Sequence, residues 1–362
     1  MRLQRWLRTL YLLVWASVLG ALAAEVLLAL ERRSARQAAD DYSRANVFDA
    51  AMLVSQGAGD GVWQERGVRY RPGARLTLEA GGETYEIAIN ARGFRGPEFA
   101  IERPPGVLRV ACIGGSTTVQ GRTNATTYPA LLQALLEAEL GRGRLEVLNL
   151  GINGARSDHW FSRLDELLGF QPDLLIQYEF VNDLFWAALP RLAAADPWIA
   201  RRNASLLLAW LLPLDERRLD PDWLELRRTL RAIARVARAR GAEYLTATFA
   251  GPDADRAEPG FRAYLDVNVE AWSRDSVRLR RYADYDRARR RFNAELASFA
   301  SDRRLELAPV ADRVRDPALF LDLCHGNARG IEALARAFVP EAARLLRPRL
   351  ATRAVPGGAG GR

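Results

Sequence analysis

The chain has 362 residues, 49% of them hydrophobic, so it can bury one large core and carry smaller attachments. The formal charge is +8, but all 52 basic residues are arginine and are spread along the chain, whereas nucleic-acid surfaces normally mix lysine with arginine and cluster them. Composition therefore predicts no nucleic-acid partner. The two cysteines, Cys112 and Cys324, exclude a disulfide framework but leave one bridge open, and no CxxC or histidine-rich spacing indicates a structural zinc site.

Residues 1–33 are predicted to form a single-pass membrane anchor. An apolar run from about Tyr11 to Leu30 is interrupted only by Glu25 and follows Trp6, a typical interfacial residue; a bilayer core needs about 20 apolar residues. A cleavable signal peptide is the alternative, because residues 21–23 read Ala-Leu-Ala, but the apolar run resumes after Glu25 and favours retention. Since long C-terminal domains translocate largely regardless of flanking charge, we expect the rest of the chain outside the cytoplasm.

Residues 34–105 are predicted to form a small β-rich prefix. Short alternating patterns at residues 69–72 and 84–89 are typical of strands, and residues 90–96, which read Asn-Ala-Arg-Gly-Phe-Arg-Gly, are typical of a turn. Pro104, Pro105 and Gly106 mark the boundary between this prefix and the next domain.

From residue 106 to residue 347, strand and helix patterns alternate, which predicts an α/β domain with a parallel sheet of about five strands covered on both faces by helices. We expect strands at residues 108–113, 145–150, 173–180, 244–249 and 305–310, and helices at 128–140, 158–170, 223–240, 282–300 and 331–346. Two stretches rich in Trp, Pro and Asp, at about 184–222 and 251–281, are interpreted as loop insertions near the site. Residues 348–362 are interpreted as a disordered tail.

Polar residues follow the predicted strands where each strand ends. The first strand is followed by Gly114-Gly115-Ser116-Thr117-Thr118, the second by residues 149–154, and the third by residues 179–183; a further polar segment lies at residues 322–325. Ligands of open parallel sheets bind at the carboxyl ends of the strands, where the strand order reverses. If the order is 2-1-3-4-5, Ser116 and Asn182 face each other across that point.

These segments resemble the marker blocks of the SGNH, or GDSL-type, hydrolase family, which appear here in the family's order over about residues 107–346. The matching residues are Ser116 for the nucleophile of block one, Gly154 for the glycine of block two, Asn182 for the asparagine of block three, and Asp322 and His325 for the pair of block five. Gly115 departs from the pattern, because many members have aspartate there. The prefix and anchor also look like those of the family's bacterial membrane-anchored branch. The resemblance implies a flavodoxin-like three-layer α/β/α sandwich and chemistry on ester or acyl groups.

The residue types suit a serine nucleophile. Ser116 needs a base, and His325 is the only candidate within a motif, with Asp322 close enough in sequence to orient its imidazole. The oxyanion is expected to meet the amides of Ser116 and Gly154 and the side chain of Asn182.

Structural interpretations of the same residues stay open. The Gly-Gly-Ser-Thr segment could bind phosphate, although it lacks the spacing and lysine of a P-loop. Asn182 could start a turn or cap a helix, and Asp322 and His325 could serve the last helix. His159 is interpreted as structural, and Cys324 is not expected to be a nucleophile because adjacent side chains point apart. The apolar segment 206–212 is too short to span a bilayer and is interpreted as core packing or as a lid that faces membrane or substrate.

The sequence thus predicts an inner-membrane, single-pass esterase or deacetylase with its catalytic domain in the periplasm, no cofactor and no metal. Its substrate carries an ester, with O-acetylated polysaccharide or lipid as candidates. One alternative is O-acyl transfer to a cell-envelope polysaccharide by the same triad of Ser116, His325 and Asp322. Whether water or a sugar hydroxyl accepts the acyl group depends on how well the site excludes water. Another is a non-catalytic carbohydrate-binding assembly protein, against which the full set of site residues argues.

Overall fold

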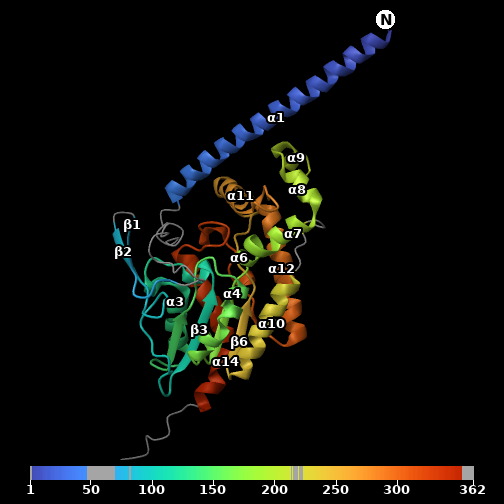
Figure 1. The fold of residues 1–362 in the computed structure, drawn as a ribbon. Coiled ribbons are helices and arrows are strands. Elements are labelled where there is room, and N and C mark those ends of the chain that lie inside the picture. Colours follow the sequence, from blue (N-terminus) through green and yellow to red (C-terminus); the bar gives the residue numbers. More distant parts are fainter. Residues whose placement is uncertain are drawn as a thin grey trace, which may run out of the picture.

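The computed structural model describes residues 2–46, 70–80, 83–212, 214, 219 and 223–352. Its centre is a five-stranded parallel sheet in the order β4-β3-β5-β6-β7 (Figure 1). The predicted order 2-1-3-4-5 is therefore confirmed, and the order reverses between β3 and β5. The strands are β3 (Leu108–Gly114), β4 (Leu145–Asn149), β5 (Leu174–Tyr178), β6 (Glu243–Ala247) and β7 (Glu306–Ala308).

Both faces of the sheet are buried, which explains why its strands are mainly apolar and do not alternate strictly between apolar and polar residues. Every residue of β3 is buried, and alternate side chains enter different hydrophobic clusters. Val110 and Cys112 belong to one cluster, whereas Ala111 and Ile113 belong to the other. A strand has a two-residue period, so these clusters lie on opposite faces of the sheet. The three-layer α/β/α architecture is confirmed.

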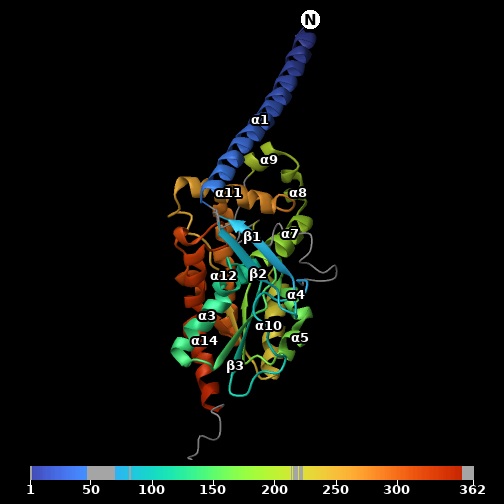
Figure 2. The same ribbon diagram turned by 90° about the vertical axis from the view of Figure 1, so that its left-hand side faces the viewer.

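Helices cover the two faces in two groups, which Figure 2 shows on either side of the sheet. One face carries α3 (Tyr128–Leu140), α12 (Tyr282–Arg303) and α14 (Ala328–Thr352). The other face carries α4 (Ser157–Ser162), α5 (Leu164–Gly169) and α10 (Leu224–Ala239). The single helix expected over residues 158–170 is thus two short helices. Helix α14 extends into the predicted tail, and residues 353–362 lie outside the described residues.

The two insertions are helical, so their interpretation as loops is wrong. They contain α7 (Leu189–Ala195), α8 (Pro197–Asn203), α9 (Leu206–Leu211) and α11 (Pro259–Ser273). Proline near the start of α7, α8 and α11 is compatible with a first helical turn, and the Ser205 hydroxyl caps α9, so these residues start helices instead of breaking them.

The remaining short elements are α2 (Ser116–Val119), η2 (Asn124–Thr126), α6 (Val181–Asp183), the π-helical turn η3 (Leu184–Ala188), α13 (Val310–Arg313) and η4 (Pro317–Leu319).

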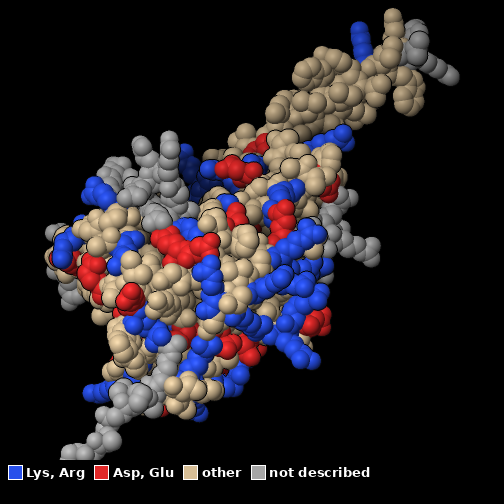
Figure 3. Space-filling view, turned by 60° about the horizontal axis from the view of Figure 1, so that its bottom comes forward, with Lys and Arg blue, Asp and Glu red and all other residues tan. Residues whose placement is uncertain are grey.

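A long helix, α1 (Arg2–Asn46), projects from the domain (Figure 1). Its stretch Trp6–Ala38 is long and apolar enough to cross a membrane, and its apolar window is fully exposed. A signal sequence passes the same test of length and composition. In Figure 3 this projecting part is a long tan stretch, and charged side chains gather where it reaches the domain.

The prefix contributes a β-hairpin and a support for the loops at the sheet's carboxyl edge. Strands β1 (Arg75–Ala80) and β2 (Glu83–Ala88) pair antiparallel. The first strand was expected at residues 69–72, but it begins only at Arg75. The buried guanidinium of Arg95 donates to the carbonyls of Val119 and Gly121 at 2.7 and 2.6 Å. The amide of Asn153 donates to the Tyr70 hydroxyl at 3.1 Å. The prefix therefore fixes the segments that follow β3 and β4.

Candidate active site

Ser116 lies at the turn between the end of β3 and the start of α2. Gly114 makes that turn possible, because a Cβ at this position would overlap the carbonyl oxygen of Tyr178 on β5. The Ser116 side chain is partly exposed, in contrast to the fully buried strand that precedes it. The sequence thus places a hydroxyl at the carboxyl edge of the sheet, beside the point where the strand order reverses.

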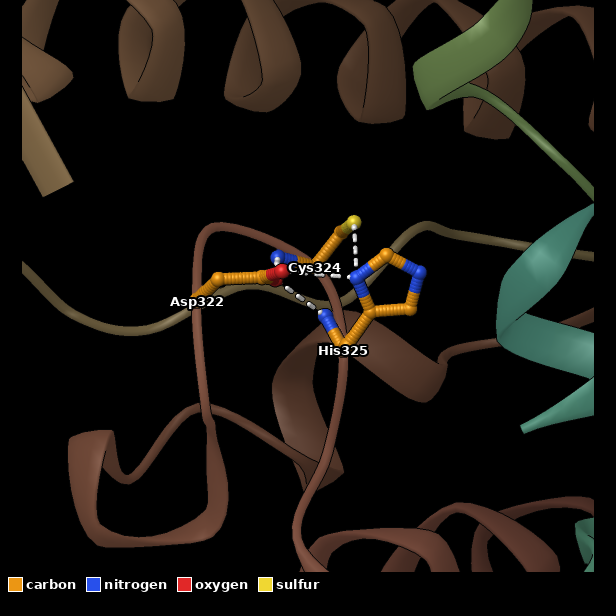
Figure 4. A group of neighbouring side chains, drawn as sticks. All are labelled: Asp322, Cys324 and His325. Atoms are coloured by element: carbon orange, nitrogen blue, oxygen red, sulfur yellow. Dashed lines mark hydrogen bonds and ion pairs between the residues drawn. The ribbon is translucent and has the colours of Figure 1, made fainter. Parts of the chain in front are cut away.

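His325 and Asp322 lie together on the tight turn before α14. The imidazole Nε2 of His325 is 2.7 Å from the Ser116 Oγ, and its Nδ1 is 2.7 Å from the Asp322 Oδ2. Figure 4 shows Nδ1 directed towards Asp322 and Cys324, with Nε2 on the opposite side of the ring. The histidine and aspartate side chains are almost fully buried. A continuous chain of hydrogen bonds therefore joins Ser116 to Asp322 through the imidazole.

Asp322 is held as a carboxylate by its surroundings. Its Oδ1 accepts the backbone amides of Cys324 and His325 at 2.8 and 2.7 Å. Burial alone raises the pKa of this group, but the imidazole of His325 and the two amide donors outweigh burial and hold the pKa below its ordinary value. A negative charge is thus fixed beside the Nδ1 edge of the ring.

The three candidate oxyanion donors lie in the segments that follow β3, β4 and β5 at the carboxyl edge of the sheet. Within the described part of the chain, the amides of Ser116 and Gly154 have no acceptor. Gly154 has φ +67°, a left-handed conformation that favours glycine. The Nδ2 of Asn182 donates to the carbonyl of Ala155 at 2.9 Å and lies 3.4 Å from Glu179 Oε2. The structure therefore orients the Asn182 amide through the loop that carries Gly154.

Glu179 is a site residue to which sequence analysis assigned no role. Its Oε1 accepts the amides of Phe180 and Asn182 at 2.9 and 3.2 Å. Its Oε2 occupies space beside the Gly115 backbone, where any Cβ at position 115 would overlap it and the Asn182 amide nitrogen. The signal in the sequence is a combination of two features: position 115 is glycine where many family members have aspartate, and a carboxylic acid stands three residues before Asn182.

Two buried carboxyl groups lie behind the oxyanion donors. Burial raises the pKa of Glu179 to about 8, and the nearby charge of Asp183 adds to this effect. Burial also raises the pKa of Asp183, to about 6, although Ser157 donates to it from its hydroxyl at 2.7 Å and from its backbone amide. The neutral form of Glu179 is favoured at pH 7.

Cys324 also lies against the imidazole, with its sulfur 3.5 Å from His325 Nδ1. Burial raises the pKa of this thiol well above its ordinary value, which disfavours a thiolate nucleophile. Asp322, Cys324 and His325 present possible metal-ligand atoms within 4.8 Å of one another. However, the hydrogen bond between Asp322 and His325 Nδ1 already engages two of these atoms, and an ion would have to break it. The donor set fits an orienting pair better than a metal centre.

The other predicted features of the site are also accounted for. Cys112 and Cys324 are both buried and free, so the open question of a bridge is answered. His159 lies in α4, where its Nδ1 accepts the amide of Arg156 at 3.2 Å, which agrees with its structural interpretation. In the segment 206–212, Leu208, Trp210, Leu211 and Leu212 are exposed, so this segment is not core packing.

Comparison with known families decides the assignment. Residues 112–333, more than half of the chain, match the model of the GDSL-like Lipase/Acylhydrolase family. The chain belongs to this family. It is therefore a GDSL-type serine hydrolase that acts on ester bonds, as the resemblance in the sequence implied. A comparison with curated proteins gives no match.

Similar solved structures are distant in sequence. An alpha/beta hydrolase enzyme from the metagenome of Lake Arreo, Spain, is 20% identical, with 67% of this chain and 98% of that chain covered and a TM-score of 0.41. An acetyl xylan esterase from Geobacillus stearothermophilus is 18% identical, with 66% and 95% covered and a TM-score of 0.43. TesA is 18% identical, with 66% and 99% covered and a TM-score of 0.40.

Proposed function

We propose that this GDSL-type hydrolase cleaves its ester with Ser116 as nucleophile, His325 as general base and acid, and Asp322 as the group that orients the imidazole. The observation that carries the proposal is the unbroken hydrogen-bond chain, 2.7 Å at each link, from the Ser116 Oγ through both imidazole nitrogens to Asp322. These distances are within reach for proton transfer.

In the first half-reaction, the Ser116 Oγ attacks the ester carbonyl carbon while its proton moves to His325 Nε2. The carbonyl oxygen becomes an oxyanion, and Asp322 stabilises the imidazolium from the Nδ1 side. When the intermediate collapses, the ester C–O bond breaks, and Nε2 gives its proton to the departing alcohol. In the second half-reaction, water loses a proton to Nε2, attacks the acyl-serine and releases the acid, and Ser116 recovers its proton.

We assign the oxyanion to the amides of Ser116 and Gly154 and to Asn182 Nδ2. The first two donors are without acceptors in the described residues, and the third is held by Ala155. Donors fixed before the reaction stabilise charge without reorganising, which makes them effective. Glu179 completes this arrangement as a positioning residue. In its neutral form it holds the Asn182 backbone and adds no negative charge beside the developing oxyanion.

The proposed location is a membrane, with α1 as a retained single-pass anchor and residues 34–347 on the periplasmic side as prefix and catalytic domain. The apolar stretch Trp6–Ala38 supports this part of the proposal. Resistance of the full-length protein to extraction by alkaline carbonate is the expected result, and release from the membrane contradicts the anchor. An inactive cytoplasmic reporter at the C-terminus is expected; an active one contradicts the orientation.

A fluorophosphonate probe tests the nucleophile, because it labels only an activated serine. We expect the wild-type protein to be labelled at Ser116, with labelling lost in Ser116→Ala and strongly slowed in His325→Ala. Labelling of the Ser116→Ala variant at the wild-type rate contradicts the proposal. A panel of acetylated sugars, lipids and small esters then identifies the ester-bearing substrate, for which O-acetylated polysaccharide and lipid are our candidates.

A further inference from the structure

The N-terminal helix is fastened to the catalytic domain by the one charged residue inside its apolar run. The Glu25 carboxylate accepts the Ser205 hydroxyl and the amides of Leu206 and Leu207 at 3.1 and 3.0 Å, and so caps the start of α9. Helices α1 and α9 lie side by side in both Figure 1 and Figure 2. A charge inside a membrane segment is costly unless it is paired, and Glu25, which is only partly buried by the protein, finds its partners at the start of α9.

Helix α9 presents apolar side chains to the outside at that level. Leu208, Trp210, Leu211 and Leu212 have exposed fractions of 39, 54, 53 and 40%. Only Ala209 in this helix is buried. Four large apolar side chains exposed together on one short helix and its C-cap are unusual on a surface that faces water, and this helix packs against α1, whose apolar side chains are also exposed.

The helix geometry places α9 at the edge of the bilayer core. From Trp6 to Glu25, α1 rises about 30 Å at 1.5 Å per residue, which equals the thickness of the hydrocarbon layer. Trp6 then lies at one edge of that layer, and Trp210, which lines a cavity with Arg32, lies at the headgroup level on the other side; tryptophan is preferred at both interfaces. The apolar tip of α9 therefore reaches the interface on the same side as the catalytic domain.

A charged cavity, lined by four arginines and four acidic residues, lies about 10 Å further along α1, at the level of lipid headgroups. It has a volume of about 470 Å³ between α1, α9 and α11, and Arg32, Arg202 and Arg280 are among its lining residues. Arg32 pairs with Glu270 at 2.7 Å, yet its Nε and Nη2, and the Nε of nearby Arg278, are buried without a partner among the described residues.

Apart from Glu31, which is exposed, the acidic residues that line this cavity are already engaged. Asp266 accepts the Tyr282 amide at 2.6 Å, and Asp284 pairs with Arg281 at 3.5 Å, besides the pair formed by Glu270. The nitrogens of Arg32 and Arg278 that lack a partner among the described residues are thus the available donors near this level, and guanidinium groups match the phosphates of phospholipids.

We propose that α9 and this cavity form a second membrane contact, in which the apolar tip of α9 enters the bilayer interface and the arginines bind lipid phosphates. The partner is the phospholipid surface of the membrane that holds α1, so the inference rests on the proposed anchor. This second contact fixes the orientation of the catalytic domain relative to the membrane, which a single membrane-spanning helix alone does not do.

The contact turns the catalytic site towards the bilayer. Helix α11 carries both Glu270, which pairs with Arg32 of α1, and Trp272, whose ring contacts the His325 ring edge-on at 6.4 Å between centroids. One helix thus links the membrane contact to the catalytic base. Docking selects ester substrates presented at the membrane surface.

Nitroxide labels on the full-length protein in phosphatidylglycerol nanodiscs test this inference. Cys112 and Cys324 are buried, so single cysteines can be labelled at Leu211 on α9, at Leu19 in α1 and at the similarly exposed Phe161 on α4. We expect the labels at positions 19 and 211 to collide more with oxygen than with an aqueous nickel reagent, and the label at 161 to show the reverse. A label at 211 that behaves like that at 161 overturns the docking, whereas an aqueous label at 19 overturns the anchor itself.

Substitution of Arg278 tests the phosphate contact. We expect Arg278→Gln to make the label at Leu211 more accessible to the aqueous reagent by at least about twofold, with the label at Leu19 unchanged. Arg142→Gln, in the exposed turn after α3, is the matched loss of one positive charge and should change neither label. If Arg278→Gln leaves the label at 211 as immersed as in the wild-type protein, the arginines do not bind lipid.

Discussion

The carboxyl group of Glu179 lies against the backbone of Gly115, in the space that a side chain at position 115 would need. Many family members have aspartate at this position, so this chain places an acid near the nucleophile from a different strand. Glycine at 115 and glutamate at 179 therefore form one structural unit, and it also positions Asn182.

Gly115→Ala is expected to damage catalysis more than folding. The new methyl group overlaps the Glu179 carboxyl and the Asn182 amide, so one oxyanion donor moves away and kcat should fall by about 10- to 10³-fold, up to the loss caused by removing one donor. Steady-state kinetics with circular dichroism measures both effects. Gly169→Ala in α5, which has open space around its Cβ, is the control and should keep wild-type activity. Wild-type kcat in Gly115→Ala contradicts the proposed unit.

Activity should fall as pH rises through about 8. Above this pH Glu179 ionises and places a negative charge beside the oxyanion donors, because burial has raised its pKa to that range. Glu179→Gln cannot ionise, so its activity at pH 7 should be about tenfold lower at most and the decline near pH 8 should disappear. If the wild-type protein and Glu179→Gln lose activity equally above pH 8, a group other than Glu179 causes the decline.

Stability should also decrease with rising pH. The folded-state pKa values of Glu179 and Asp183 lie above their ordinary values of 4.5 and 3.8, so the folded protein binds more protons than the unfolded chain. Their contribution is fully present below pH 3.8, the lower of the two ordinary values, and is lost as pH rises towards 8, the folded-state pKa of Glu179. The free energy of unfolding, measured with urea, should fall less between pH 5 and pH 8 in Glu179→Gln than in the wild-type protein.

Asn182→Ala isolates the proposed oxyanion hole. Loss of its Nδ2 removes one donor, so kcat should fall by about 10²–10³-fold while the fold is retained. Asn182→Asp is a useful second variant, because it keeps the size but replaces the donor with an acceptor next to Glu179, and its kcat should fall at least as far. If a folded Asn182→Ala variant keeps the wild-type kcat, Asn182 is not an oxyanion donor and its role is structural.

The sequence predicted the sheet order and the meeting of Ser116 with His325, because buried parallel strands and polar strand ends follow local patterns. It did not predict the role of Glu179, since that depends on how close its carboxyl group, just after β5, lies to the backbone of Gly115, just after β3. The helices of the insertions were missed because prolines at helix starts resemble loop signals. The cap that Glu25 places on α9 spans 180 residues of sequence, and no local pattern indicates such a contact.

The proposed joint action of Ser116 and His325 is tested most directly by a double-mutant cycle on ester hydrolysis. Ser116→Ala and His325→Ala should each lower kcat by about 10⁴–10⁶-fold, and the double variant should be scarcely slower than either, because both changes remove the same pathway. Asp322→Ala should cost less, and His159→Ala should stay near wild type. Additive losses in the double variant, or retained activity in folded Ser116→Ala, would contradict the account.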